Sequence, residues 1–379
     1  MSPPSRSLRV LMTADAVGGV WVVATGLARK LCRRGAQVTL VTLGPPPNEN
    51  QIWELNGVEG LEVEITDLTL EWMEPRGLDL PRARFRLANL ERRVRPHVVH
   101  INGFREAAIG WKAPVLVTAH SCVRSWSLAC REAEPAEREW QDYAANVRLG
   151  LEAAKCWIAP TIAFRDKIQS LYSPRPSGHV IYNGIEGVLP GQEKEPFILA
   201  AGRLWDEAKN VAVLSSVASE LDWPMRIAGA SDFPGAKQIG IPRTTAERIG
   251  ALYRPHLLEQ MQRAGIFAAC PVYEPFGLTI LEAAASGCAL VLSDIPTLRE
   301  LWSDAALFAD PRSPSAFRDA LQQACRDAEL RKSLQLAALK RARSYSLDRT
   351  VEAYGELYHE FSADRLEPQR RQKSCGEAL

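Results

Sequence analysis

Short runs of apolar, mostly β-branched residues recur along the first half of the chain, with helix-length segments between most of them. Strands of a parallel sheet covered by helices on both faces have this pattern, because neither face of such a strand meets water. The pattern therefore predicts a doubly wound α/β domain over residues 1–185. The predicted strands lie at residues 8–14, 37–43, 61–65, 97–101, 114–119, 156–160 and 179–185.

The series restarts after residues 186–196, whose Gly, Pro and charged residues are typical of a linker. Runs at residues 197–202, 225–230, 266–271 and 288–294 predict a second α/β domain over residues 197–345. Ligands of open parallel sheets bind beyond the carboxyl ends of the strands, so we expect a substrate in the cleft between the two sheets. Residues 363–379 are charged and without a pattern, and we expect them to be disordered.

Composition and charge limit the possible partners. The 379 residues include 46 Lys and Arg and 45 Asp and Glu, and the net charge of +1 gives no overall attraction to nucleic acid. The eight cysteines are scattered without a C-x-x-C pair, which is typical of reduced proteins. No stretch has the length and apolarity of a signal peptide or a membrane span, so we expect a soluble, cytoplasmic protein.

One basic segment leaves peripheral membrane contact open. Six arginines fall within one predicted helix: Arg82, Arg84, Arg86, Arg92, Arg93 and Arg95. They could contact an anionic membrane surface or form a solvated helix face, and the sequence favours the second.

Two segments that follow predicted strands are suited to a phosphate. Gly18 and Gly19 stand between the first strand and a helix, where adjacent glycines let the backbone approach an anion, or form a purely structural turn. Arg203 and Lys209 follow the first strand of the second domain. They could clamp a diphosphate, although Lys209 could instead pair with a carboxylate next to it in the chain.

The stretch "YEPFGLTILEAAASG" (273–287) combines groups for a phosphate and for sugars. We expect Glu274 in a loop at the end of a buried strand, and Glu282 about one turn into a helix that ends at Gly287. Backbone N–H groups at the helix start suit a phosphate, and carboxylates suit vicinal hydroxyls.

These segments together resemble the retaining family 4 glycosyltransferases of GT-B fold over residues 8–360. The resemblance rests on Glu274 and Glu282 with seven residues between them, and on four further segments. These are "GGV" (18–20), "VIYNGI" (180–185), "AGRLWDEAKN" (201–210) and "GCALVLSDIPTLRELWSDAALFADP" (287–311). The resemblance implies two Rossmann-like domains that face a central cleft, with residues 346–362 packing back on the first domain.

The resemblance also implies roles for individual residues. Glu282 would hold the ribose of a nucleotide, Glu274 the hydroxyls of the donor sugar, and His120 would meet that sugar near its reacting face. Arg203 and Lys209 would neutralise the diphosphate. The other implied donor contacts are the backbone of Phe276, Gly277 and Leu278 and, from the opposite domain, Gly18 and Gly19.

Two departures from the family pattern concern the donor site. Arg203 and Lys209 are one residue further apart than is usual, and Pro271-Val272 replaces the usual Pro-Ser.

The chain has no D-x-D motif, so we expect cations and helix N-termini to replace a metal ion, and we expect no cofactor. The resemblance implies transfer of a hexose, from UDP-glucose first or GDP-mannose next, by front-face substitution with retention. The acceptor is open among saccharide, small-molecule and lipid-linked hydroxyls. Its candidate contacts are Trp21, Asn102, Arg105, Arg124 and Trp126. A GT-B epimerase or phosphorylase and a catalytically silent nucleotide-sugar-binding protein are the alternatives.

Overall fold

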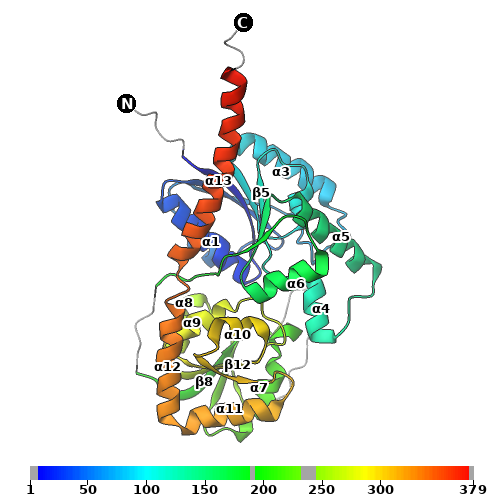
Figure 1. Ribbon diagram of the computed structural model, residues 1–379. Helices are drawn as coiled ribbons and strands as arrows, with labels where there is room; N and C mark the ends of the chain where they lie inside the picture. Colours follow the sequence, from blue (N-terminus) through cyan, green and yellow to red (C-terminus); the bar gives the residue numbers. More distant parts are fainter. Residues whose placement is uncertain (1–6, 188–192, 232–244, 375–379) are drawn as a thin grey trace.

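The computed structural model describes residues 7–187, 193–231 and 245–374, which contain two parallel β-sheets (Figure 1). The first sheet has seven strands in the order β3-β2-β1-β4-β5-β6-β7. They are β1 (Arg9–Asp15), β2 (Gln37–Leu43), β3 (Leu61–Ile65), β4 (Val98–Ile101), β5 (Val115–Thr118), β6 (Cys156–Ala159) and β7 (Gly178–Val180). Each predicted run overlaps one of these strands, so the doubly wound α/β fold is confirmed here.

The second sheet has the order β10-β9-β8-β11-β12-β13. Its strands are β8 (Glu195–Ala201), β9 (Met225–Ala228), β10 (Glu247–Gly250), β11 (Ala264–Ala269), β12 (Ala289–Ser293) and β13 (Ala306–Ala309). The sequence did not predict β10 and β13, because both are short and β10 is mostly exposed and has no apolar run. Strand β8 begins within the predicted linker, of which residues 188–192 lie outside the described residues.

Both faces of the central strands of each sheet are buried, as the near-continuous apolar runs require. In β1, Leu11 packs in one core, whereas Val10 and Met12 pack in the core on the other face. In β8, Leu199 and Ile198 are divided between two cores in the same way. The first-domain helices are α1 (Gly19–Arg33), α2 (Glu49–Trp53), α3 (Leu80–Val94), α4 (Val123–Arg131), α5 (Arg138–Ala153) and α6 (Ile162–Tyr172). Those of the second domain are α7 (Val211–Val217), α8 (Arg254–Arg263), α9 (Leu278–Ala285), α10 (Pro296–Trp302), α11 (Pro314–Arg326) and α12 (Ala328–Ala342).

The last helix, α13 (Leu347–Ser374), runs from the second domain back along the first (Figure 1). Its Val351, Tyr354 and Tyr358 are buried in a core of the first sheet. The tyrosine hydroxyls reach that sheet: Tyr358 bonds His100 Nδ1 (2.6 Å) and Tyr354 bonds Thr118 Oγ1 (3.0 Å).

Residues 363–374 of the tail that the sequence predicts to be disordered continue α13. Residues 375–379 lie outside the described residues.

The two domains meet at the start of α6, where groups from the second domain complete the helix cap. Glu300 accepts hydrogen bonds from the backbone N–H of Ile162 and Ala163, both at 2.8 Å. Thr161 caps from within the first domain by accepting from the N–H of Phe164 (3.2 Å). Its hydroxyl donates to the Pro275 carbonyl (3.0 Å), and so α6 is tied to the loop before α9.

The predicted arginine cluster lies on and just after α3, and three of its six members are paired with acidic residues. Arg82 and Arg86 contact Asp67, and Arg93 contacts Glu62 and Glu64. These pairs reduce the positive charge that α3 presents. No helix in the described part of the chain is long and apolar enough to cross a membrane.

Candidate functional site

The loop between β11 and α9 carries Glu274 at the carboxyl end of the second sheet. Gly277, at φ +87°, turns the chain into α9, because this left-handed conformation is open to glycine at no steric cost. The Tyr273 hydroxyl accepts from the N–H of Cys122 in the first domain (3.1 Å). On the other side of the loop, Thr297 donates to the carbonyl of Glu274 (2.6 Å). Glu274 is thus held between the two domains.

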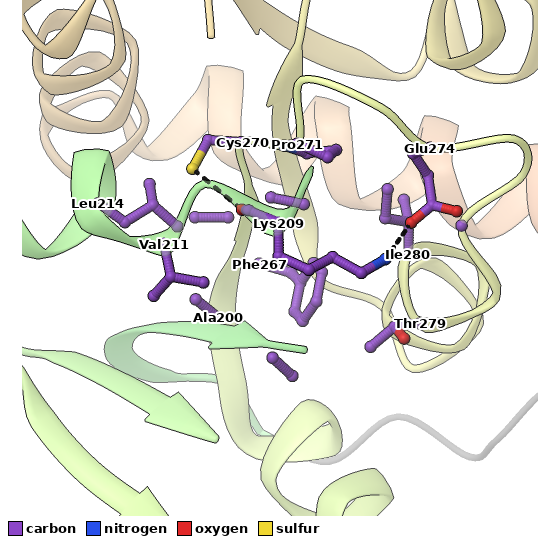
Figure 2. Close-up of a pocket in the computed structure, with 14 residues that line it drawn as sticks. Ala200, Lys209, Val211, Leu214, Phe267, Cys270, Pro271, Glu274, Thr279 and Ile280 are labelled. Carbon is purple, nitrogen blue, oxygen red and sulfur yellow. Dashed lines mark hydrogen bonds and ion pairs between the residues drawn. The ribbon is translucent and has the colours of Figure 1, made fainter. Parts of the chain in front are cut away.

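Lys209 reaches Glu274 across a small cavity. Figure 2 shows the two side chains pointing toward one another, with the Lys209 ammonium 2.6 Å from Glu274 Oε2. Lys209 ends a short 3₁₀ turn, Glu207–Lys209. Its ion-pair partner is Glu274 and not an acidic neighbour in the chain. The cavity, about 30 Å³, holds about one water, so a sugar at Glu274 would have to occupy the cleft outside it.

Glu282 lies one turn into α9 with its side chain about 8% exposed, and Arg254 Nε donates to its Oε1 (2.8 Å). Burial raises the pKa of Glu282, and the neighbouring Arg254 opposes that rise. Arg254 is the first residue of α8 and was missed by the sequence reasoning. The Arg-Pro pair signals a helix start there, but nothing local indicates that Arg254 faces Glu282.

Arg203 and the glycine pair come together across the cleft. Arg203 Nη2 pairs with Asp206 Oδ2 (2.6 Å), and Nη1 donates to the Val17 carbonyl of the first domain (3.4 Å). A Cβ atom on Gly18 would lie 2.9 Å from Arg203 Nη1, and one on Gly19 would lie 3.3 Å from the Leu278 side chain. The absence of side chains at these two positions lets the first domain approach the start of α9.

The N–H groups at the start of α9 are only partly available to an anion. Phe276 is buried and its N–H is directed to Glu274 Oε1 (3.4 Å). Ile280 and Leu281 donate to the Gly277 carbonyl. The first N–H groups of a helix have no acceptor within it, so those of Leu278 and Thr279 are the ones suited to a phosphate.

His120 is neutral and fixed in one tautomer. Asn102 Nδ2 donates to the Thr13 carbonyl (2.8 Å), so Asn102 Oδ1 is an acceptor and the His120 Nε2, 2.7 Å away, carries the proton. Burial lowers the pKa of His120 to about 4. Asn102, expected among the acceptor contacts, therefore orients His120, whose Nδ1 is an acceptor.

The prediction that Arg105 and Trp21 contact the acceptor is wrong, because both side chains are buried. The Arg105 side chain is about 1% exposed and pairs with Glu74, Asp79 and Glu106, because it turns from the end of β4 into the protein. Trp21 is about 3% exposed, because its position on α1 faces the sheet.

Arg124 and Trp126 differ in their surroundings, although both lie on α4. Arg124 donates to the Leu171 carbonyl (2.7 Å) and to Glu134 (2.6 Å), and it does not line the interdomain cavity. Trp126 does line that cavity, and its Nε1 donates to Asp206 Oδ1 (3.2 Å).

The interdomain cavity has a volume of about 430 Å³ and is bounded by both domains. Sequence reasoning missed most of its aromatic and acidic lining: Asp15, Glu71, Trp72, Trp140, Tyr143 and Trp205. Trp205 lies two residues after Arg203 in the segment 201–210, and this closeness to a predicted donor residue could have indicated it. Glu71 and Trp72 lie far in sequence from Trp140, and none of the three carries a local signal. In the described residues, no three His, Cys, Asp or Glu side chains are grouped so that they could hold a metal ion.

Two family models together match most of the chain. "Glycosyltransferase Family 4" matches residues 17–186 and "Glycosyl transferases group 1" matches residues 185–341. A D-inositol 3-phosphate glycosyltransferase of Nocardia farcinica is 27% identical over 91% of this chain and 85% of its own length. An alpha-maltose-1-phosphate synthase of Mycolicibacterium smegmatis is 27% identical over 52% of this chain and 58% of its own length.

Solved structures share the fold over nearly the whole chain. Sucrose-phosphate synthase from Thermosynechococcus elongatus has a TM-score of 0.76 at 17% identity, and covers 95% of this chain and 100% of its own. Anabaena HepE in complex with UDP-glucose has a TM-score of 0.74 at 14% identity, and the match covers 93% of this chain and 100% of the HepE chain.

Proposed function

Because the chain belongs to the family 4 glycosyltransferases of GT-B fold, we propose that it is a retaining enzyme that moves a hexose from a nucleotide diphosphate sugar. UDP-glucose is the first donor of this proposal and GDP-mannose the next. The acceptor is a hydroxyl of a saccharide, a small molecule or a lipid-linked compound.

The observation that carries this proposal is the meeting of Arg203, Lys209 and Glu274 at the start of α9, opposite the glycine pair of the first domain. Two cations and free helix N–H groups suit a diphosphate. Each cation is paired with a carboxylate, Arg203 with Asp206 and Lys209 with Glu274, and these ion pairs fix the position of each cation. On donor binding, the diphosphate would share Arg203 and Lys209, and sugar hydroxyls would donate to Glu274.

Glu282 suits the ribose of the donor. Arg254 occupies its Oε1, which leaves the other carboxylate oxygen for a hydroxyl. Arg254 would hold this carboxyl in place and favour its ionised form, which opposes the rise in pKa that burial causes.

The chemical step would be front-face substitution. The bond from the sugar C1 to the phosphate oxygen breaks, the bond from C1 to the acceptor oxygen forms on the same face, and the acceptor proton passes to the leaving phosphate oxygen. Arg203, Lys209 and the α9 N-terminus would stabilise the charge that develops on that phosphate without a metal ion. Neutral His120 would contact the sugar as a hydrogen-bonding group and not as a cation.

The relatives guide the choice of donors and acceptors to test. HepE was crystallised with UDP-glucose, and the curated relatives are named for D-inositol 3-phosphate and for alpha-maltose 1-phosphate. A thermal-shift panel of UDP, GDP and ADP sugars, run with EDTA, tests donor binding, and product analysis with candidate acceptors tests transfer. Stabilisation by none of these nucleotide sugars would refute the proposal.

Glu274→Ala should reduce transfer by roughly 10²–10³-fold while the melting temperature stays close to that of the parent, because the carboxylate would contact the donor. Glu329→Ala, at an exposed position on α12, is the matched control and should keep full activity. Near-parental turnover of Glu274→Ala would remove Glu274 from the site.

A further inference from the structure

We propose that the acceptor is a hydroxyl-bearing ring compound without a phosphate group, bound among tryptophan side chains in the interdomain cavity. The inference rests on the proposed function and specifies the acceptor of the same site. The cavity adjoins the donor groups, because Arg203 lines it and also lies at the proposed diphosphate position.

Four tryptophans from separate parts of the chain line the cavity. Trp72 follows β3, Trp126 lies on α4, Trp140 on α5, and Trp205 follows β8. All four are partly exposed, unlike Trp21 in the core. Indole rings stack on apolar faces of sugar or aromatic rings and lose little conformational entropy when they do so.

Neighbouring groups hold these rings in place. Arg131 lies over the Trp126 ring at 4.9 Å, and Arg203 lies over the Trp205 ring at 5.2 Å. Trp140 packs edge-on against Tyr143, with ring centroids 6.0 Å apart. Rings fixed before binding favour a flat, rigid ligand, because less entropy is lost when it binds.

The charges of the cavity disfavour a phosphate. Arg131 and Arg203 are the cations among the described lining residues, and they pair with Glu207 (3.0 Å) and Asp206 (2.6 Å). Arg203 is assigned to the donor diphosphate, so a phosphorylated acceptor would compete with the donor for it, and to gain Arg131 it would have to displace Glu207.

The remaining acidic groups suit hydroxyls. Glu71 Oε2 accepts from the backbone N–H of Phe104 (3.2 Å) and of Arg105 (2.9 Å), which fixes its carboxyl beside the cavity. Asp15 lies on the same side, next to the glycine turn. An ionised carboxylate repels phosphate and accepts from hydroxyls, while a protonated one supplies only a neutral donor, so neither state favours a phosphate.

The volume of about 430 Å³ lies within the range of roughly 300–1,000 Å³ that small-molecule sites occupy. It accommodates one or two rings. Both a saccharide ring and an aromatic ring have the required flat apolar face, and the experiment separates these two sources.

The test measures binding calorimetrically on the full-length protein, both alone and saturated with UDP. Matched pairs that differ only in a phosphate are compared: myo-inositol with D-inositol 3-phosphate, and phenyl β-glucoside with its 6-phosphate. Cellobiose and 1-naphthol distinguish a saccharide from an aromatic ring. We expect each phosphate to weaken binding about tenfold or more. Equal or tighter binding of the phosphorylated partners, or binding of no ring compound at all, overturns the proposal.

Variants locate the site. Trp140→Ala and, as a second test, Trp72→Ala should weaken ring binding about tenfold and leave the affinity for UDP-glucose unchanged. The control Trp53→Ala removes a tryptophan that is 71% exposed on α2, outside the cavity, and should have no effect. Glu207→Gln should release Arg131 and improve binding of the phosphorylated partners. If both Trp140→Ala and Trp72→Ala bind ring compounds as Trp53→Ala does, the cavity is not the acceptor site. If the parent protein does not bind UDP-glucose, the proposed function itself is contradicted.

Discussion

Replacing Glu300 with alanine tests how the two domains are held together. Its carboxylate is the second domain's contribution to the cap of α6, through the N–H groups of Ile162 and Ala163. Tyr182 donates to the same carboxylate (3.0 Å), which fixes its orientation. The substitution removes these three hydrogen bonds and leaves the Thr161 cap in place.

The expected loss follows from the geometry. Loss of a side-chain cap costs about 0.5–2 kcal/mol, and loss of a negative charge at a helix N-terminus about 0.3–1 kcal/mol. Thr161 still satisfies the Phe164 N–H, so α6 should persist. We therefore expect the free energy of unfolding of Glu300→Ala to fall by about 1–3 kcal/mol. Glu300→Gln keeps an acceptor oxygen but not the charge, and should lose about half as much.

Urea unfolding followed by circular dichroism measures this loss, with the first transition compared because a two-domain chain need not unfold in one step. Small-angle scattering of the folded proteins should give a larger mean radius for Glu300→Ala, since one contact between the domains is gone. Glu352→Ala, at an exposed position on α13, is the control. If Glu300→Ala and Glu352→Ala have the same stability and radius, the interdomain cap contributes nothing.

Buried histidines and the glycine turn give two further expectations. Burial lowers the pKa of His100 to about 3 and of His120 to about 4. The unfolded chain, with His pKa values of about 6.5, therefore binds more protons, and the free energy of unfolding should fall as the pH drops from about 6.5 toward 3. Burial raises the pKa of Glu71 to about 8, so protonation of this carboxyl stabilises the folded protein as the pH falls, opposite to the histidines. The free energy of unfolding should therefore be measured by urea titration of the Glu71→Gln variant, at about pH 7 and about pH 5. An equal free energy at both pH values would contradict the histidine assignment. Gly18→Ala places a Cβ 2.9 Å from Arg203 Nη1, at a backbone φ of +155° that residues with a side chain rarely adopt. It should raise the KM for the donor about tenfold or more and also lower the melting temperature; an unchanged KM would exclude Arg203 from the diphosphate.

The sheets could be predicted from sequence because strands that are buried on both faces are near-continuous apolar runs. Every predicted run overlaps a strand. Strand β10 was missed because it is mostly exposed and has no apolar run, and β13 is a missed apolar run of four residues.

Pairing within the site could be predicted much less well. Glu274 and Lys209 were each recognised as candidates, but their contact depends on how two loops meet in space. Arg105 follows a strand that ends at the cleft, and only the structure reveals that its side chain turns back into the protein. Trp140 and Glu71 reach the cavity from distant parts of the chain, and no local pattern distinguishes them from surface residues.

The return of α13 to the first sheet has a consequence for biosynthesis. The ribosome makes residues 1–185 first, yet the core of that domain includes Val351, Tyr354 and Tyr358, which are translated after the entire second domain. Until then His100 lacks its Tyr358 partner, and the part of that apolar face which α1 does not cover stays exposed. Domains of large proteins generally fold in order as they emerge. Here the N-terminal domain should become protease-resistant only after the second domain has been synthesised, so the order of completion is the reverse of the order of translation.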